Sequence, residues 1–187
     1  MTAITQHKKM PEQTDPRGNF ISTYSGQRFY IEDPNVQDIP IFDIAHALSM
    51  KCRFNGHTKT FYSVAEHSVY VSEYVPAEDA LWGLLHDISE AFLPDVPRPV
   101  KPFISGFKSL ERKIMGSAID TFGLPQTEPQ SVHDVDKHIV ASEAAVLFAE
   151  RPDWIHAYDM NVAPVHKRCI GWPPNVARAQ WIHRFKE

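Results

Sequence analysis

The chain has 187 residues, of which 43% are hydrophobic and 22% are charged, so its composition excludes wholesale disorder. This length predicts one domain, with residues 1–19 as a flexible polar arm and residues 20–187 as a single folded unit. The net charge of −4 lacks the basic field of a general nucleic-acid binder, so we expect no nucleic-acid polymer as a partner. No stretch free of Asp, Glu, Lys and Arg exceeds ten residues, and the N-terminus has no apolar signal segment. We therefore expect no membrane contact and a cytoplasmic location.

The predicted elements begin with a small β-hairpin and continue as helices. Two β-prone runs, Phe20–Tyr24 and Arg28–Ile31, flank a Ser-Gly pair that is typical of a tight turn. Farther along, apolar residues at helical spacing predict helices over residues 41–50, 62–75, 77–93, 105–122, 131–150 and 175–185. Ser63 and Glu66 have the spacing of a capping box, whereas the prolines of residues 94–102 exclude helix. The sequence therefore predicts an all-α bundle with a small N-terminal β-hairpin.

Several ionisable residues fall on predicted helix faces that are otherwise apolar. His67 is one of them, and on its own it is more typical of a hydrogen-bonded core imidazole than of a metal ligand. His86, Asp87 and Glu90 lie together on an apolar helix, where burial without partners is costly and a solvated face is the alternative. Asp136 lies on an apolar stripe, where either a cation or the positive end of its helix would stabilise the carboxylate.

Together, two imidazoles and two carboxylates on three predicted helices form a sound ligand set for a divalent metal ion. The set is His67, His86, Asp87 and Asp136. Imidazole suits Zn, Co, Ni, Fe or Mn, and carboxylates extend the choice to Mg. Four protein ligands leave positions for water and substrate, as a catalytic site requires. We therefore expect a divalent ion as the cofactor, provided that these four side chains meet in the fold.

The order of these ligands resembles that of the HD-domain metal-dependent phosphohydrolase superfamily. SVAEHS at residues 63–68 and HDISEAFLPDVPRPVK at residues 86–101 resemble the 5′-deoxynucleotidase branch, which includes phage-encoded dATP triphosphohydrolases. Arg53-Phe54 resembles the Arg-aromatic pair of that branch, although the aromatic residue there is Trp and the spacing to the first His is one residue longer. The resemblance covers roughly residues 38–150 and implies that residues 20–187 form a single HD phosphohydrolase domain.

The resemblance also implies roles for residues around the predicted metal ligands. Glu90 corresponds to a residue that handles protons beside the metal, and Asp95 to an acidic residue near the scissile phosphate and the sugar. Both are therefore expected to be catalytic. Arg53 and Lys101 correspond to phosphate contacts, and Phe54 would border the base.

The reaction that the resemblance implies is hydrolysis of the 5′-phosphoester bond of a deoxynucleotide, with a divalent ion activating the water. The substrate most typical of the phage enzymes is dATP, which would give deoxyadenosine and triphosphate, with dADP and dAMP as further substrates. The alternatives are a 5′-deoxynucleotidase acting on dNMPs generally, another HD chemistry such as cyclic-dinucleotide or (p)ppGpp cleavage, and a non-catalytic regulatory HD fold. The resemblance also implies a homo-oligomer, either a dimer or a hexamer, and the host cytoplasm if the gene is phage-encoded.

Overall fold

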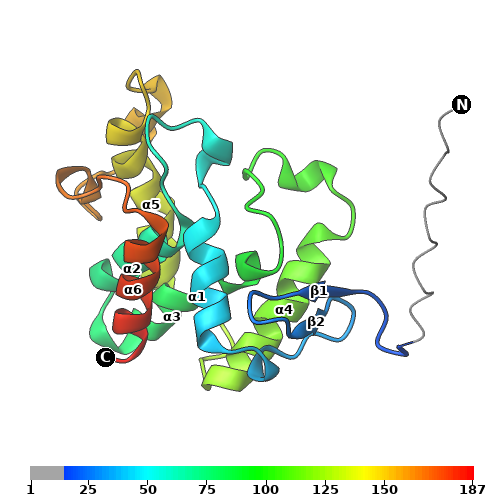
Figure 1. The fold of residues 1–187 in the computed structure, drawn as a ribbon. Helices are drawn as coiled ribbons and strands as arrows, with labels where there is room; N and C mark the ends of the chain where they lie inside the picture. The colour runs from blue at the N-terminus through cyan, green and yellow to red at the C-terminus, as the bar shows by residue number, and fades with distance from the viewer. Residues whose placement is uncertain (1–14) are drawn as a thin grey trace, which may run out of the picture.

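The computed structural model describes residues 15–187, apart from the side chain of Lys167, and is mainly helical (Figure 1). Within this range the α-helices are α1 (Ile41–Met50), α2 (Val64–Tyr74), α3 (Ala80–Leu85), α4 (Phe107–Phe122), α5 (Gln130–Leu147) and α6 (Pro174–Phe185). Strands β1 (Phe20–Ser22) and β2 (Arg28–Tyr30) form one antiparallel pair. The predicted helical bundle with an N-terminal hairpin is confirmed. Residues 1–14, most of the predicted arm, lie outside the described residues.

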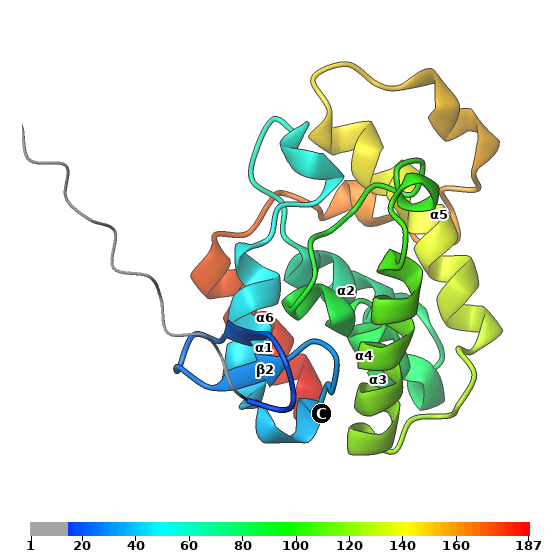
Figure 2. The same cartoon turned by 90° about the vertical axis from the view of Figure 1, so that its right-hand side faces the viewer.

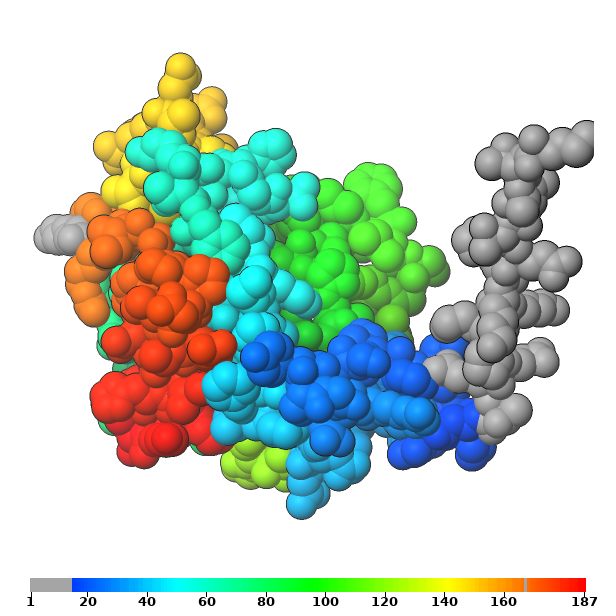
Figure 3. Space-filling model, in the orientation of Figure 1, coloured from blue at the N-terminus to red at the C-terminus, as the bar shows by residue number. Residues whose placement is uncertain are grey.

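The hairpin is fastened to α1 by one buried carboxylate. Asp43 accepts hydrogen bonds from the Thr23 hydroxyl at 2.5 Å and from the Ser25 amide and hydroxyl at 3.0 and 2.7 Å. Both donor residues lie in the loop between β1 and β2, so the three bonds hold the loop on the helix. Figure 3 shows the hairpin, in blue, lying against α1, in cyan.

Helix α2 lies at the centre of the bundle and contacts α1, α3, α5 and α6 (Figures 1 and 2). Every residue from Val64 to Ser72 is buried, including four polar ones. Ser63 caps the helix by accepting a hydrogen bond from the Glu66 amide, as the capping box predicts. The Glu66 carboxylate does not reach back, because it accepts a hydrogen bond from the Trp172 amide instead. This central helix carries His67 into the interior.

The continuous helix predicted over residues 77–93 was wrong, because the chain leaves α-helical geometry at His86-Asp87. Helix α3 ends at Leu85, Asp87 adopts φ −102° and ψ 19°, and a 3₁₀ turn, η4 (Ile88–Ala91), follows. The Lys51 ammonium binds the main-chain carbonyls of Glu90 and Leu93, which stabilises this turn in place of further α-helix. Because of this break, the side chains of His86 and Asp87 do not have the relative directions that a continuous α-helix would give them.

The remaining predictions hold with small shifts of boundary. Helix α4 ends at Phe122, and Gly123 follows with a φ of +64°, a left-handed conformation that glycine adopts without steric cost. The proline-rich strip contains no α-helix and only one 3₁₀ turn, η5 (Lys101–Phe103). After α5 the chain forms a further 3₁₀ turn, η6 (Asp153–Ala157), that the sequence did not predict. No helix in the described part of the chain has the length and apolar character needed to cross a bilayer.

Candidate metal centre and cavity

The four predicted ligands meet in one place although three separate segments carry them. His67 lies on α2, His86 and Asp87 at the break after α3, and Asp136 on α5. The His67 Nε2 atom is 3.2 Å from His86 Nε2, 3.3 Å from Asp136 Oδ1 and 3.7 Å from Asp87 Oδ2. The His86 Nε2 atom is 3.2 Å from Asp87 Oδ2 and 3.8 Å from Asp136 Oδ1. We call these four residues the ligand cluster.

Each imidazole of the cluster is oriented by a partner on its other nitrogen. His67 Nδ1 lies 2.6 Å from Glu143 Oε1, and His86 Nδ1 lies 2.8 Å from the Gly83 carbonyl oxygen. Both partners accept hydrogen bonds, so Nδ1 carries the proton in each ring. In the neutral imidazoles the Nε2 lone pairs then face the centre of the cluster, which is the arrangement typical of metal-binding histidines.

The donor set and its spacing fit a divalent ion. Bonds from such an ion to imidazole nitrogen and carboxylate oxygen measure about 2.0–2.2 Å, so adjacent tetrahedral ligand atoms lie about 3.3–3.6 Å apart. The five distances given above, which join a His67 or His86 nitrogen to the other ligand-cluster atoms, range from 3.2 to 3.8 Å. The ligand atoms of His67, His86 and Asp87 all lie within 4.8 Å of one another, a group that does not include Asp136. These three side chains are therefore suited to hold a divalent ion, with Asp136 beside the two imidazoles.

Glu143 is a functional residue of this region that the sequence analysis missed. Its side chain is fully buried and accepts hydrogen bonds from His67 Nδ1 and from the Tyr62 hydroxyl, the latter at 2.7 Å. Burial raises the pKa of Glu143, but His67 and Arg53 outweigh it, so the pKa lies below its usual range. A signal was present in the sequence: Glu143 follows Asp136 by seven residues, which is two helical turns along the same face of α5.

Arg53 connects Glu143 to the ligand cluster. Its guanidinium lies 3.5 Å from Glu143 Oε2 and 3.4 Å from Asp87 Oδ2. Burial alone would lower the pKa of Arg53, but these two carboxylates raise it above its ordinary value, so the side chain stays charged. The next residues, Phe54 and Asn55, have φ values of +54° and +52°, which is unusual for residues other than glycine. A strained backbone at Phe54 and Asn55 therefore holds the Phe54 ring beside the site.

A cavity of about 610 Å³ opens beside the ligand cluster. This volume is within the range of small-molecule sites. Seven of the nine predicted site residues line it, whereas His67 and His86 lie deeper, with side-chain exposures of 0% and 5%. The cavity lining also includes residues that the sequence did not predict: Val96, Pro97, Arg98, Pro99, Val140, Trp154 and Tyr158. The cavity thus joins the ligand cluster to a surface that is partly charged and partly apolar.

The two predicted catalytic carboxyl groups both line this cavity, Glu90 buried and Asp95 half-buried. Burial raises the pKa of Glu90 well above its usual value, and the neighbouring carboxylates of Asp87 and Asp95 raise it further. Its Oε2 atom has no hydrogen-bond partner. Burial also raises the pKa of Asp95, and Arg53 offsets this only in part. Carboxyl groups with raised pKa values are suited to exchange protons with a bound reactant near neutral pH.

Two further cations reach the cavity from the proline-rich strip. Lys101 Nζ pairs with Glu111 Oε1 at 2.8 Å. Burial lowers the pKa of Lys101, but this partner outweighs the effect and raises it. Arg98 is mostly exposed and reaches Asp136 Oδ2 at 3.4 Å, so it faces the cavity as well as solvent. The strip therefore adds positive charge beside the ligand cluster.

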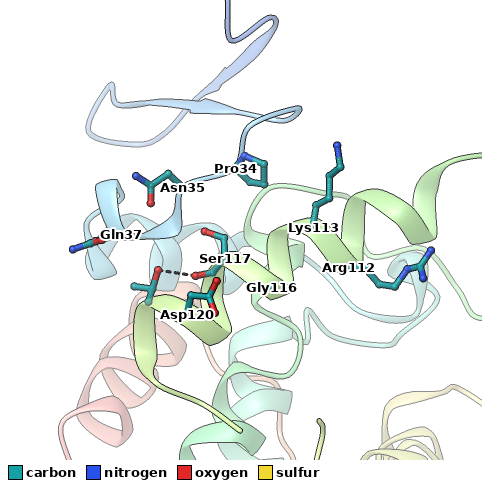
Figure 4. Close-up of a pocket in the computed structure, with 9 residues that line it drawn as sticks. Pro34, Asn35, Gln37, Arg112, Lys113, Gly116, Ser117 and Asp120 are labelled. Carbon is teal, nitrogen blue, oxygen red and sulfur yellow. Dashed lines mark hydrogen bonds between the residues drawn. The ribbon is translucent and has the colours of Figure 1, made fainter. Parts of the chain in front are cut away.

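A second pocket, of about 510 Å³, lies elsewhere, between α4 and the segment before α1. In Figure 4 its two cations, Arg112 and Lys113, point away from Ser117 and Asp120. Since these side chains do not converge, the pocket lacks the arrangement of a ligand site. None of the predicted site residues lines it.

The fold and the site thus define a helical protein with two imidazoles and two carboxylates gathered beside one cavity. Its sequence is 42% identical over 169 residues to the uncharacterized protein YfdR of Escherichia coli strain K12, an alignment that covers 90% of this chain and 95% of YfdR. The chain therefore belongs to the same family as YfdR. It is also 39% identical over 118 residues to an uncharacterized protein of Rhodobacter capsulatus, covering 58% of this chain and 60% of that protein. No model of a known protein family matches the sequence.

Proposed function

We propose that this protein is a metal-dependent phosphohydrolase of the HD-domain type that cleaves the 5′-phosphoester bond of deoxynucleotides, with dATP as the first candidate substrate. The observation that carries the proposal is the meeting of His67, His86, Asp87 and Asp136 beside a cavity that also contains two further acids and three cations. A homo-oligomeric assembly is part of the proposal.

The four cluster residues would hold the ion, which when bound lowers the pKa of water and offsets phosphate charge. Lys101 and Arg53 place positive charge where phosphoryl oxygens gain negative charge during hydrolysis. Glu90, buried beside Asp87, would accept the proton of the attacking water. Asp95, whose pKa burial raises, would donate a proton to the leaving 5′-oxygen.

The test is a screen of dNMPs and dNTPs with Mn²⁺, Co²⁺, Zn²⁺, Ni²⁺, Fe²⁺ and Mg²⁺, with products separated by chromatography. Release of deoxynucleoside with triphosphate identifies attack at the α-phosphorus, whereas release of inorganic phosphate from dNMPs identifies a 5′-deoxynucleotidase. The control variants are His86→Ala and Asp87→Ala, which should lose both bound metal and activity while circular dichroism shows a retained fold. Full turnover in either variant, or a metal-loaded protein that hydrolyses none of these substrates, contradicts the proposal.

A further inference from the structure

One wall of the cavity is aromatic and comes from the part of the chain after α5. Trp154 belongs to the 3₁₀ turn η6 and Tyr158 follows it, and both side chains line the cavity that contains Asp87 and Asp136. Figure 2 shows this turn at the same end of the molecule as the proline-rich strip. The segment lies beyond residue 150, outside the stretch that resembles the deoxynucleotidases. We call Trp154 and Tyr158 the aromatic wall.

The aromatic wall is held rigidly on α5. Ile155, between the two aromatic residues, is fully buried against Ala141 and Ala144 of that helix. At the end of the segment, the Asp159 amide donates a hydrogen bond of 2.9 Å to His138 Nδ1, also on α5. A buried side chain and a main-chain hydrogen bond therefore fix the turn relative to Asp136 on the same helix.

The two rings form a corner rather than a stack. Their centroids are 5.9 Å apart, and the ring planes meet at 82°. A planar ligand ring lying flat on one of them would meet the other edge to face, and both arrangements are favourable for aromatic pairs. The Phe54 ring also lines this cavity.

Packing of the fold alone does not account for Trp154. Ile155 already closes the small apolar cluster on α5, whereas Trp154 keeps 40% of its surface exposed. A large aromatic side chain left open to a cavity that also carries Arg98 and Lys101 matches an amphiphilic ligand with a flat apolar part and an anionic part.

We propose that Trp154 and Tyr158 bind the nucleobase of the substrate by stacking, while Arg98 and Lys101 face its phosphates. This inference rests on the proposed function, because it names which end of the substrate each part of the cavity takes. Stacking on aromatic side chains is tolerant of base identity, so the aromatic wall selects nucleotides over phosphate esters that lack an aromatic base.

The first test uses tryptophan fluorescence and does not depend on turnover. The chain has four tryptophans, of which Trp82 and Trp181 are buried and Trp172 packs on Tyr70, with 5.3 Å between the ring centroids. Titration with deoxyadenosine should quench the emission of the unaltered protein and of the matched control Trp172→Phe. The quench should disappear in Trp154→Phe. Equal quenching in Trp154→Phe and the unaltered protein overturns the proposal.

The second test compares two substrates in Trp154→Leu, which keeps an apolar side chain but removes the ring. A base stacked on an aromatic residue contributes about 1–3 kcal/mol, which corresponds to roughly 5- to 150-fold in affinity. KM for the deoxynucleotide should therefore rise roughly fivefold or more, whereas turnover of deoxyribose 5-phosphate should stay unchanged. An equal loss on both substrates, with unchanged thermal stability, contradicts the stacking role. Quenching without any hydrolysis would support the aromatic wall and refute the proposed reaction. Hydrolysis of nucleotides without quenching would support the proposed reaction and refute the aromatic wall.

Discussion

His67 and His86 each present one ring nitrogen to the ligand cluster because the other nitrogen is already engaged. The partner of His86 is a main-chain carbonyl, which substitution cannot remove, whereas the partner of His67 is the carboxylate of Glu143. Glu143 also pairs with Arg53, so one buried acid orients both His67 and a cation that lines the cavity. Individual residues outside the ligand cluster therefore control its geometry.

Glu143→Gln should lower metal affinity by roughly 10- to 100-fold, the effect typical of losing a partner behind a metal-bound histidine. The amide has nearly the same shape as the carboxylate, so the fold should remain. It lacks the negative charge that His67 and Arg53 face, so it should orient His67 less firmly. Competition with a chromophoric chelator measures the affinity. The matched control is Glu73→Gln, which removes a surface pair with Arg168 and should leave metal affinity unchanged. Equal affinities in the two variants would show that Glu143 does not support the site.

Glu90→Ala should keep the metal and slow hydrolysis by roughly 10²- to 10⁴-fold, the range typical of losing a general base. Glu90 lies buried beside Asp87, and one of its carboxyl oxygens has no hydrogen-bond partner, so it is available to accept a proton. It is not part of the ligand cluster, so its removal should leave the ion in place. Metal analysis and single-turnover kinetics on the same preparation separate the two effects. Loss of the metal from this variant would instead make Glu90 a ligand.

At the scale of elements, α3 lies tightly against α2 at Gly83, one turn before His86. A Cβ atom at this position would lie 3.1 Å from Ser72 Cα and 3.3 Å from the Ser72 nitrogen, both main-chain atoms of α2. The same glycine supplies the carbonyl that orients His86. The position of His86 in the ligand cluster therefore depends on how closely two helices pack.

Gly83→Ala should lower both the free energy of unfolding and the metal affinity, because α3 must move away from α2 to admit the methyl group. The control is Gly116→Ala on α4, where a Cβ atom meets nothing within 4 Å. That change should stabilise the protein by about 0.5–1 kcal/mol through helix propensity alone. Urea denaturation and chelator competition measure the two quantities. Stabilisation of both variants by similar amounts would contradict the tight contact.

At the scale of the whole molecule, three segments that are distant in the chain bring ionisable groups into one partly buried cluster, and the ion would link them. Burial lowers the pKa of His86, but the carboxylate of Asp87 outweighs this and raises it to about 10. Without an ion, His86 is therefore protonated at neutral pH and donates to Asp87. A metal ion must displace this proton before it binds Nε2.

Apparent metal affinity should consequently rise with pH through the neutral range, by up to roughly tenfold per pH unit for one displaced proton. Calorimetric titrations at pH 6, 7 and 8, in buffers that differ in ionisation enthalpy, measure both the affinity and the protons released. About one proton should be released for each ion bound at pH 7. At fixed pH, the metal should also raise the melting temperature, since unfolding separates the ligands. Affinity that does not change with pH would mean that His86 is neutral before the ion binds.

Most of the helices were predictable because they follow from local patterns. The apolar spacing of residues 41–50 agrees with the bounds of α1, and Gly123 ends α4 where predicted. The ligand residues were also identifiable, since ionisable side chains on apolar faces need partners wherever they are buried. The prediction failed at His86-Asp87, where a local pattern favoured continuous helix and Lys51, the residue after α1, stabilised a different turn.

The amino-acid sequence by itself determined which residues are apolar, where most of the helices lie, and which polar side chains require burial with partners. Only the tertiary structure decided that the nitrogens of His67 and His86 lie 3.2–3.8 Å from each other and from Asp87 and Asp136, that Glu143 lies behind His67, and that Trp154 faces the same cavity. The reason is physical. Helix periodicity is a property of a few neighbouring residues, whereas the distance between side chains on different helices depends on how the whole core packs.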